Sequence, residues 1–409
     1  MSTPSPPIAI IGAGLSGLTL ALALYNHSIP STLYESRPSP LDIGGAIMLS
    51  PNALKILDFL GVYQHIAPLG FHFEKLYFRS HDDIPIDDFD FSSRDKHGYK
   101  ALRIYRYQLI NVLLSMVRNA GIPVHYNKKF SQVTSETPES VTWTFADGSS
   151  ATASLLIGAD GIHSRVRKHI YPDLTPKFTN MIGVTAAVPR AQLQAEPEYP
   201  LPVTIMSPKR GAFVIAPQRA DGSEVLIGKQ KRLEQEYDRA GWDELMENKS
   251  WCVDFLRQGS KDFPPIVAHA VSDIPLKGIN LWPFYIVPKL DTWTKGRVVI
   301  LGDAAHAIPP TAGQGVNQAF EDVYTFARVV AKEREQYQSL EGGDAVRFGR
   351  TLKKWQLGRQ ARVDKVLELN DKLNKRRLPD AGEVGDLEPF ELDWLYGVDF
   401  EELIAEWAS

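Results

Sequence analysis

The chain has 409 residues, of which 44% are hydrophobic and 23% are charged, and its 45 basic and 49 acidic residues give a formal net charge of −4. This length is enough for one large domain or two ordinary domains with a sizeable core. The mixed charge offers no electrostatic basis for binding nucleic acid or an anionic membrane. The single cysteine, Cys252, excludes a disulfide within the chain, and we predict a small core residue there and no metal site.

The apolar segment 8–24 resembles a signal peptide in composition only. No basic residue precedes it, and three glycines interrupt it. It is also broken too soon to span a bilayer. We therefore expect a soluble, cytoplasmic protein without a membrane span.

A strand, a glycine-rich turn and a helix follow one another at the start of the chain. The apolar run Ile8–Ile11 leads directly into Gly12-Ala13-Gly14-Leu15-Ser16-Gly17, and the apolar segment 18–25 continues it. Gly12 permits the tight turn, Gly14 lets a pyrophosphate reach the backbone, and Gly17 lets the helix pack on the strand. The pattern predicts a dinucleotide site formed by Gly12, Gly14, Leu15, Ser16 and Gly17.

A second strand, 32–34, ends in Glu35, which lies 18 positions after Gly17. A carboxylate at this position hydrogen-bonds a ribose hydroxyl, so Glu35 argues against a 2′-phosphate and therefore against NADP as the occupant. The strand, the helix and the acid do not separate FAD from NAD.

The segment 42–120 contains two further candidate cofactor contacts. Gly44 and Gly45, followed by Ala46, indicate either another close approach of backbone to a ligand or a simple turn. Arg106 begins a predicted helix, 107–120, where a cation is unfavourable with the helix dipole. An anionic partner would explain it, and an ordinary surface arginine is the alternative. A helix is predicted at 51–60, strands at 75–80 and 100–105, and a polar connection at 82–97.

Two later strands also end in a glycine and an aspartate. Short antiparallel strands are predicted over 122–145, with a hairpin turn at 147–148. The strand 154–157 then leads into Gly158-Ala159-Asp160-Gly161, and the strand 298–301 leads into Gly302-Asp303. After the second of these, Pro309 and Pro310 stiffen a loop. Gly313 and Gly315 follow and open a helix at 316–330. This arrangement predicts a nucleotide cofactor held at strand ends, and a ligand-free connection is the alternative.

The pattern of predicted elements changes between residues 179 and 281. Strands are predicted at 181–188, 202–206, 211–216 and 224–228, followed by a charged helical region at 235–258. No glycine fingerprint occurs there. After residue 330 the sequence is helical to about 376, and a linker at 378–389 precedes a last helix at 400–407.

Three ordered motifs make the chain resemble the single-component (group A) FAD-dependent aromatic monooxygenases, the class of p-hydroxybenzoate and salicylate hydroxylases, and in texture their fungal secondary-metabolism members. The motifs are Gly12/Gly14/Gly17 with Glu35, Gly158-Ala159-Asp160-Gly161 with Ser164-Arg165, and Gly302-Asp303-Ala304-Ala305-His306 with Pro309 and Gly313-Gln314-Gly315. The resemblance covers roughly the first 180 residues and 282–362.

The resemblance implies an α/β fold with a Rossmann-like FAD-binding domain, an inserted, mostly β substrate domain and C-terminal helices. We place the FAD-binding domain at 1–75, 101–180 and 282–365, the substrate domain at 76–100 and 181–281, and the C-terminal helical segment at 366–409. By resemblance, Glu35 holds the adenosine ribose, Arg106 contacts the cofactor and Asp160 lies by the pyrophosphate region. Asp303 binds the ribityl or pyrophosphate part, and Pro309 and the segment Gly313, Gly315 and Val316 lie against the isoalloxazine ring.

The resemblance also implies the chemistry. NAD(P)H is the transient reductant of FAD, O2 forms a flavin C4a-hydroperoxide, and one oxygen atom enters a hydrophobic, electron-rich aromatic or indole-like small molecule. Epoxidation, Baeyer–Villiger or dearomatising oxidation and a flavin-dependent reductase without oxygenase activity are the alternatives. The protein is expected to be a monomer or a homodimer.

The residues at the substrate are harder to assign. Phe213, Trp282, Phe284 and Tyr285 either line an apolar pocket or belong in part to the core. Tyr285-Ile286 stands where several relatives have an Asp-Arg pair, which makes the predicted pocket more apolar. His306 is expected to be a structural hydrogen-bonding residue rather than a base, and Arg190 and Arg210 are expected at the surface.

Overall fold

The computed structural model describes residues 6–40, 45–310, 313–337, 345–377 and 390–407. The predicted linker at 378–389 and the predicted glycine at 44 lie outside these residues. Within them, short apolar runs form a six-stranded sheet in the order β18-β19-β12-β1-β2-β8. The strands are β18 (Thr294–Lys295), β19 (Val298–Ile300), β12 (Leu156–Gly158), β1 (Ile8–Ile11), β2 (Ser31–Tyr34) and β8 (Val124–His125).

The strands that precede the three sequence motifs are neighbours in this sheet. β1 pairs in parallel with β12, and β12 pairs in parallel with β19. All three strands are buried along their whole length, as their continuous apolar runs predict for a sheet covered on both faces. The carboxyl ends of these strands, and therefore the three glycine-bearing turns, lie together at one edge.

The region predicted as short antiparallel strands divides between two sheets. β9 (Phe130–Glu136), β10 (Val141–Phe145) and β11 (Ser150–Ala153) form an antiparallel sheet, with the predicted hairpin turn between β10 and β11. The prediction is wrong for β8, which pairs in parallel with β2. The helix α5 (Arg106–Asn119) carries the chain across the parallel sheet, so the strand that follows it extends that sheet.

The inserted region forms a seven-stranded sheet in the order β17-β13-β16-β15-β14-β5-β6. The strands predicted at 181–188, 202–206, 211–216 and 224–228 are confirmed as β13 to β16. The strands are β17 (Asn280–Ile286), β13 (Lys177–Pro189), β16 (Glu224–Arg232), β15 (Gly211–Pro217), β14 (Val203–Ser207), β5 (Lys75–Ser80) and β6 (Pro85–Asp90). β17 continues the sheet past residue 282, where the sequence places the domain boundary.

The polar connection predicted at 82–97 is wrong, because it contains the edge strand β6 and the short helix α4 (Arg94–His97). Phe89 of β6 is buried, whereas Asp88 and Asp90 are exposed and both approach Lys75 of the neighbouring strand. An edge strand with acidic residues on its outward side lacks the apolar alternation that predicts a strand.

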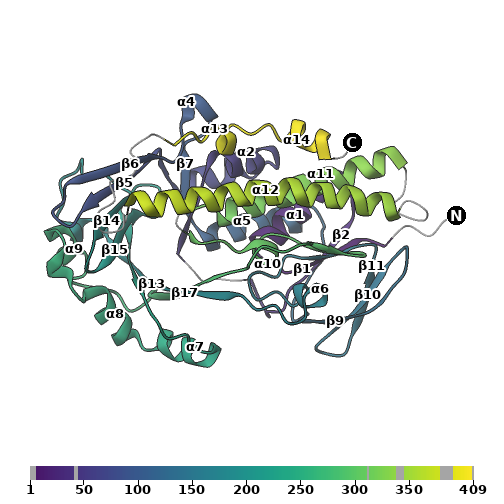
Figure 1. Cartoon of the computed structure of the whole chain (residues 1–409), viewed down its shortest axis with the longest axis horizontal. Helices are drawn as coiled ribbons and strands as arrows, with labels where there is room; N and C mark the ends of the chain where they lie inside the picture. Colours follow the sequence, from purple (N-terminus) through teal and green to yellow (C-terminus); the bar gives the residue numbers. More distant parts are fainter. Residues whose placement is uncertain (1–5, 41–44, 311–312, 338–344, 378–389, 408–409) are drawn as a thin grey trace.

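The seven-stranded sheet has two distinct faces. We call outer the face that packs against α7 (Arg239–Glu247), α8 (Lys249–Arg257) and α9 (Pro265–Ala270), and Figure 1 shows these helices on the side away from the six-stranded sheet. The opposite, inner face meets a small sheet of β3 (Ala46–Leu49), β7 (Ala101–Tyr105) and β4 (Phe71–Phe73), in the order β3-β7-β4. The two sheets are joined through Gln218, which accepts from the Ala46 N–H and donates to the Tyr105 hydroxyl.

Long helices cover the other side of the molecule. α1 (Leu15–Asn26) lies beside α11 (Gly315–Tyr337) and α5, and α12 (Ala345–Arg377) runs along much of the long axis of the molecule (Figure 1). The predicted helices at 51–60 and 400–407 are confirmed as α2 (Pro51–Phe59) and α14 (Phe400–Trp407), and a short α13 (Asp393–Tyr396) precedes α14.

Candidate functional site

The first glycine turn is shaped by close backbone contacts. Gly12 has a φ of +106°, and a Cβ atom there would lie 2.5 Å from the carbonyl oxygen of Ala159. A Cβ atom at Gly17 would lie 1.9 Å from the carbonyl oxygen of Gly12. Both positions therefore require glycine, as the sequence motif predicts. Glu35 closes the turn from the side, since its carboxylate accepts a hydrogen bond from the Ala13 N–H at 2.9 Å.

The start of α1 is open. Gly14 is its N-cap residue, no side chain caps the helix, and a Cβ atom at Gly14 would meet nothing within 4 Å. The N–H groups of Leu15 and Ser16, in the first turn of the helix, thus have no side-chain cap. A helix start of this kind, reached through an open glycine, fits a pyrophosphate.

The carboxylate of Asp160 accepts hydrogen bonds from residues of its own turn. Its two carboxylate oxygens accept hydrogen bonds from the Ser164 hydroxyl at 2.5 Å, the Arg165 N–H at 2.7 Å and the Val166 N–H at 3.2 Å. Burial raises the pKa of Asp160 against the effect of these hydrogen bonds. Arg167 then donates to the Ala304 carbonyl oxygen at 2.9 Å, which joins the second turn to the third. The contacts seen for Asp160 are therefore structural.

The third turn rests on the start of α1. Gly302 has a φ of +59°, and a Cβ atom there would lie 2.9 Å from Ser16 Oγ. Its N–H donates to Asp322 Oδ2 at 2.8 Å, and the same oxygen is 2.5 Å from His306 Nε2. Asp322 on α11 therefore holds both ends of the short helix α10 (Asp303–His306). Neither Asp322 nor its partners on α12 are found by the sequence motifs.

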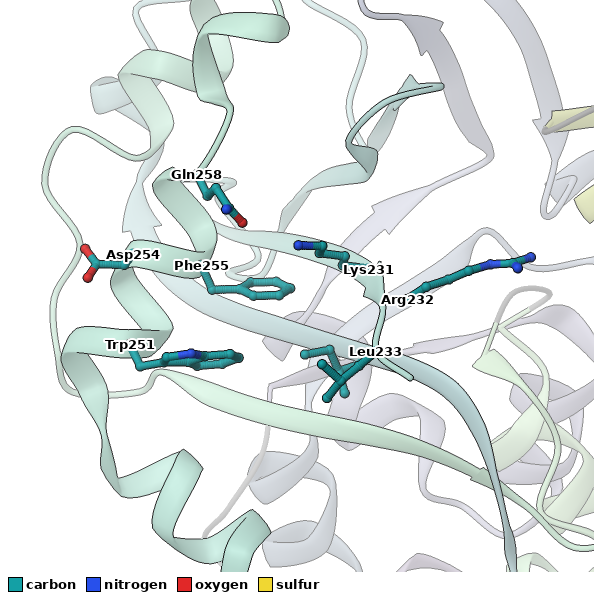
Figure 2. Close-up of a pocket in the computed structure, with 8 residues that line it drawn as sticks. Lys231, Arg232, Leu233, Trp251, Asp254, Phe255 and Gln258 are labelled. Carbon is teal, nitrogen blue, oxygen red and sulfur yellow. The ribbon is translucent and has the colours of Figure 1, made fainter. Parts of the chain in front are cut away.

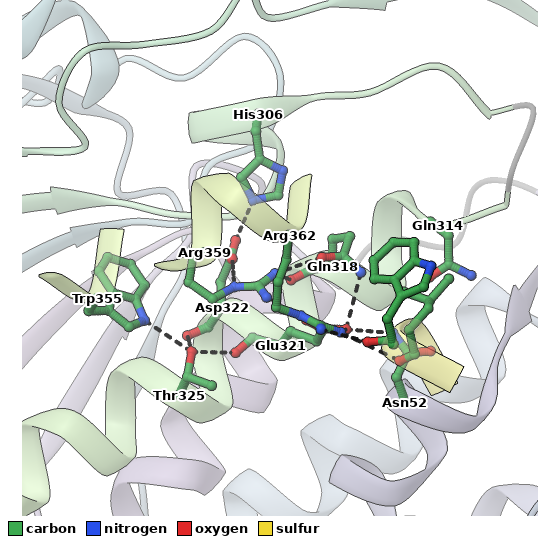
Figure 3. A network of polar contacts seen from close by, with 12 residues as sticks. Asn52, His306, Gln314, Gln318, Glu321, Asp322, Thr325, Trp355, Arg359 and Arg362 are labelled. Atoms are coloured by element: carbon green, nitrogen blue, oxygen red, sulfur yellow. Dashed lines mark hydrogen bonds and ion pairs between the residues drawn. The ribbon is translucent and has the colours of Figure 1, made fainter. Parts of the chain in front are cut away.

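A buried polar network continues from Asp322 (Figure 3). Arg359 of α12 contacts Asp322 Oδ1 at 2.8 Å and also pairs with Glu321, while Arg362 pairs with Glu321 at 2.6 Å. Asn52 of α2 donates to Glu321 at 2.7 Å. Burial by itself would raise the pKa of Glu321, but the charges of Arg362 and Arg359 lower it to about 2. The paired charges fix the start of α11, and hence the third turn, to α2 and α12.

A sequence signal for this network exists on the two helices. Asn317, Gln318 and Glu321 of α11, together with Gln314 just before the helix, have the spacing of one helix face. Arg359 and Arg362 have the same helical spacing on α12. Polar residues at this spacing indicate that the helix face has hydrogen-bond or ion-pair partners on another element. The sequence does not show which helices meet.

Arg106 and Asp303 are charged groups at the turns whose side chains make no hydrogen bond or ion pair with the described residues. Arg106 is half-buried, and its guanidinium makes no hydrogen bond or ion pair with the residues that the structure describes. Burial lowers its pKa, and the charge of Asp303 acts in the opposite direction, so the two groups lie within electrostatic reach. Asp303 is exposed in the first turn of α10. A cation and a carboxylate beside an open helix start, neither of them hydrogen-bonded to a described residue, fit a phosphate and a sugar hydroxyl.

The segment 45–46 lies where the inner face meets the turns. The Ala46 N–H donates to Gln218 Oε1 at 3.2 Å, and a Cβ atom at Gly45 would lie 3.3 Å from Leu226 Cδ1. Gln218 also donates to the Tyr105 hydroxyl at 2.9 Å. The chain around Gly45 and Ala46 is therefore positioned by Gln218, which directly follows β15, and by Leu226 of β16.

The loop before α11 lies close to the same place. Pro309 is half-buried. Gly313 has a φ of +63°, and a Cβ atom there would lie 3.0 Å from Met48 Cε and 3.2 Å from Phe91. A Cβ atom at Gly315 would meet nothing within 4 Å, so the start of α11 at Gly315 and Val316 is open in the same way as the start of α1.

The four predicted substrate residues do not lie together. Phe213 is fully buried on the outer face and packs against Phe263, so it belongs to the core. Tyr285 packs against Phe178, accepts from Trp242 Nε1 at 3.0 Å and donates to Glu236. The prediction of a shared pocket is therefore corrected for these two residues, because alternate residues of a strand point to opposite faces.

Trp282 and Phe284 point to the inner side of the sheet. Phe284 lies over Gly183, where a Cβ atom would be 3.1 Å from its ring, and Trp282 is 40% exposed. Arg210 pairs with Asp262 and Arg190 donates to the Pro197 carbonyl oxygen, so both have partners within the inserted region.

A separate cavity of about 360 Å³ opens between β16 and α8 (Figure 2). Trp251 and Phe255 of α8 face Leu233 across it. This cavity lies on the helix-covered side of the sheet, so it is not adjacent to the glycine-bearing turns.

The residues at the turns thus fit a dinucleotide, because they provide two open helix starts, a carboxylate at the end of β2 and the Arg106 cation, which has no ion pair in the described part of the chain. A family model described as an FAD binding domain matches residues 6–337, and the chain belongs to this family. This match confirms the predicted cofactor FAD and the predicted class of the fold.

Characterised relatives support the same class. A 6-hydroxynicotinate 3-monooxygenase of Bordetella bronchiseptica is 28% identical over 340 residues, covering 79% of this chain and 82% of the relative. A 3-amino-4-hydroxybenzoate 2-monooxygenase of Streptomyces cremeus is 29% identical, covering 95% and 94%. The solved structure of a salicylate hydroxylase substrate complex superimposes with a TM-score of 0.78 at 22% identity over 99% of this chain and 98% of the other. The chain is an FAD-dependent monooxygenase, as the sequence predicts.

Among the helices that the structure describes, none is both long enough and apolar enough to cross a membrane.

Proposed function

We propose that the protein inserts one oxygen atom from O2 into a hydrophobic, electron-rich aromatic or indole-like molecule, with NAD(P)H as the reductant. The observation that carries this proposal is the inner face of the seven-stranded sheet, which approaches the segment 45–46 beside the candidate cofactor turns. Its positions toward that site hold small and apolar residues that are half-buried, namely Thr185, Ala187, Thr204, Ala212, Val214 and Leu226.

The residues of the chain contribute positioning, charge and exclusion of water. FAD, when bound, supplies the chemistry that activates O2 for transfer of a single oxygen atom. The open start of α1 binds the pyrophosphate, and the Glu35 carboxylate orients the ribose. The start of α11 offers N–H groups and the positive end of a helix dipole, which favours negative charge by about 0.3–1 kcal/mol at an exposed site. The inner face covers the reaction from solvent.

The overall reaction balances with one equivalent of each reactant. The aromatic C–H bond, O2, NAD(P)H and one proton give a C–OH bond, water and NAD(P)⁺. The names of the relatives, monooxygenases of 6-hydroxynicotinate and 3-amino-4-hydroxybenzoate, support a ring already rich in electrons as the substrate. Membership of fungal secondary metabolism remains a prediction from the sequence.

A substrate screen tests the proposal. Purified holoprotein is mixed with NADPH or NADH and a panel of phenols, aromatic acids and indoles under ¹⁸O2. We expect at least one compound to accelerate NAD(P)H consumption and to gain a single ¹⁸O atom by mass spectrometry. NAD(P)H consumption that no compound accelerates, together with products that never carry ¹⁸O, would contradict the proposal and favour a reductase.

The structure of the product separates the alternative oxygenations. Hydroxylation leaves an aromatic ring with a new hydroxyl group, epoxidation or dearomatisation removes ring aromaticity, and Baeyer–Villiger oxidation inserts oxygen next to a carbonyl carbon. NMR of the ¹⁸O-labelled product distinguishes these outcomes.

We also propose the division into an FAD-binding domain at 1–75, 101–180 and 282–365, a substrate domain at 76–100 and 181–281, and a C-terminal segment at 366–409. The pairing of β17 with β13 supports moving the last boundary to the end of β17. A cytoplasmic monomer or homodimer completes the proposal, and light scattering of the holoprotein measures the oligomeric state.

A further inference from the structure

A buried arginine that has no ion-pair partner among the described residues lies on the small sheet, on the face directed toward the seven-stranded sheet. Arg103 lies in the middle of β7, the central strand of the β3-β7-β4 sheet, and is only 6% exposed. Its Nε atom has no hydrogen-bond partner. Its guanidinium forms no ion pair with any residue that the structure describes. A buried charge is costly unless it is paired, and buried arginines are usually paired for this reason.

The direction of the Arg103 side chain follows from the strand register. Leu102 and Ile104 pack into the core beside α1 and α5, so Arg103, between them, points to the other face of the small sheet. Tyr105 shares that face, and its hydroxyl contacts Gln218 and Glu224 of the seven-stranded sheet. Arg103 therefore points toward the inner face, on the side where we propose that the substrate binds.

The neighbours of Arg103 place it near the candidate flavin edge. Met48 and Phe71 lie directly opposite it on β3 and β4, and directly opposite residues of antiparallel strands share a face. Met48 Cε is 3.0 Å from the position of a Cβ atom on Gly313. One side chain thus separates Arg103 from the loop that precedes α11.

No acid in the described part of the chain compensates Arg103. Burial lowers its pKa to about 10, and Tyr105 is the titratable group that acts on it in the opposite direction. Glu224 of β16 accepts from the Tyr105 hydroxyl and also pairs with Arg219. Beyond Glu224, the next three inner-face positions of β16 are Leu226, Gly228 and Gln230. None of these three residues is charged.

We propose that Arg103 determines substrate specificity by binding an anionic group, a carboxylate or a phenolate, on the aromatic substrate. This inference rests on the proposed function. The guanidinium supplies a planar pair of donors that match two oxygens, and the apolar wall around it accommodates the ring. The bound anion would compensate a charge that the protein leaves unpaired.

Matched pairs of ligands test the proposal on the holoprotein. The first arm compares aromatic acids with the corresponding amides, for example salicylate with salicylamide and 4-hydroxybenzoate with 4-hydroxybenzamide, extended to two-ring acids. The second arm compares phenols without a carboxylate at pH 7 and pH 9, because phenols near pKa 10 ionise progressively over this range. Perturbation of flavin absorbance on titration gives each Kd.

We expect wild-type protein to bind at least one anion ten- to a hundred-fold more tightly than its neutral counterpart, and Arg103→Met to abolish this preference. A preference confined to the first arm identifies a carboxylate, and one that appears only at pH 9 identifies a phenolate. Arg103→Lys should retain part of the preference. Arg210→Met, which removes an exposed arginine paired with Asp262, is the matched control and should behave as wild type.

Three results would overturn the proposal: no preference for an anion in either arm, a preference that survives in Arg103→Met, or a loss of FAD from Arg103→Met. The last would mean that Arg103 serves the cofactor. Thermal melting adds an independent readout, because removal of an unpaired buried charge should leave the melting temperature unchanged or raise it. Oxygenation of a neutral ring without anion preference would remove this inference and leave the proposed function intact. Anion binding without any ¹⁸O incorporation would leave this inference intact and contradict the proposed function.

Discussion

Asp322 and His306 are joined by a contact of 2.5 Å between Oδ2 and Nε2, and both side chains are buried. Because the same carboxylate oxygen accepts from the Gly302 N–H, one residue in α11 fixes the strand-end turn at both ends of α10. Burial would raise the pKa of Asp322, but the charges of His306 and Arg359 outweigh it and lower the pKa. His306 thus makes the structural hydrogen bond expected from its sequence context.

The first prediction concerns this contact. Asp322→Asn removes one of the negative charges that compensate the buried Arg359 guanidinium. We therefore expect the free energy of unfolding to fall by about 3–5 kcal/mol and FAD to be retained more weakly. Thermal release of the flavin, followed by its fluorescence, measures both effects. Glu401→Gln, which removes an exposed partner of Arg328, is the control. An Asp322→Asn protein with the same melting temperature as wild type would contradict the role assigned to the network.

The second prediction separates two glycines of one motif. Gly17→Ala places a Cβ atom 1.9 Å from a backbone oxygen, so it should impair folding itself. Gly14→Ala meets no protein atom within 4 Å, so the protein should fold normally but bind FAD at least ten-fold more weakly, because the methyl group occupies the approach of the pyrophosphate. Circular dichroism and FAD titration of the apoprotein distinguish the two. Equal FAD affinity in Gly14→Ala and wild type would argue against a pyrophosphate at this turn.

The third prediction concerns the unpartnered charges. Arg106→Met and Asp303→Asn each remove a group without an ion-pair partner among the described residues, so neither should lower the stability of the apoprotein by more than about 0.5 kcal/mol. Each should weaken FAD binding by about ten-fold, or about 1.4 kcal/mol. Asp254→Asn, at an exposed acid of α8, is the control, and full FAD retention in Asp303→Asn would contradict its placement at the cofactor.

The fourth prediction is a pH dependence. The folded state lowers the pKa of Glu321 from 4.5 to about 2, so its ionised form stabilises the folded protein fully above the ordinary pKa. This contribution, roughly 3 kcal/mol by the pKa difference, should be lost as the pH falls from about 4.5 toward 2. Glu321→Gln should be less stable than wild type at pH 7 and should show a shallower loss of melting temperature between pH 4.5 and pH 3. Parallel curves for the two proteins would assign the acid sensitivity to other groups.

The sequence predicts the cofactor side of this protein because glycine requirements are local. Gly17 is needed by its contact with the Gly12 carbonyl oxygen inside one strand-turn-helix unit, and Gly12 has a positive φ in the turn of that unit. The order of strand, glycine turn and helix is visible in the residues alone. The parallel pairing of β1, β12 and β19 then follows from three apolar runs that must be covered on both faces.

The substrate side could not be predicted in the same way. The sequence offers Phe213 and Tyr285 as candidates because they are aromatic, but the register of β15 and β17 turns both toward the outer helices. A shift of one residue in register exchanges the two faces of a strand, and the local sequence does not fix that register in an inserted sheet.

What the sequence by itself determined was the FAD-binding framework and the class of enzyme, because strand ends and glycine turns are coded by neighbouring residues. Only the tertiary structure decided that Asp322 holds His306 and that Arg103 is buried without a counter-charge among the residues that the structure describes. Both facts depend on segments far apart in the chain, and the cost of burying a charge becomes apparent only when its surroundings are known.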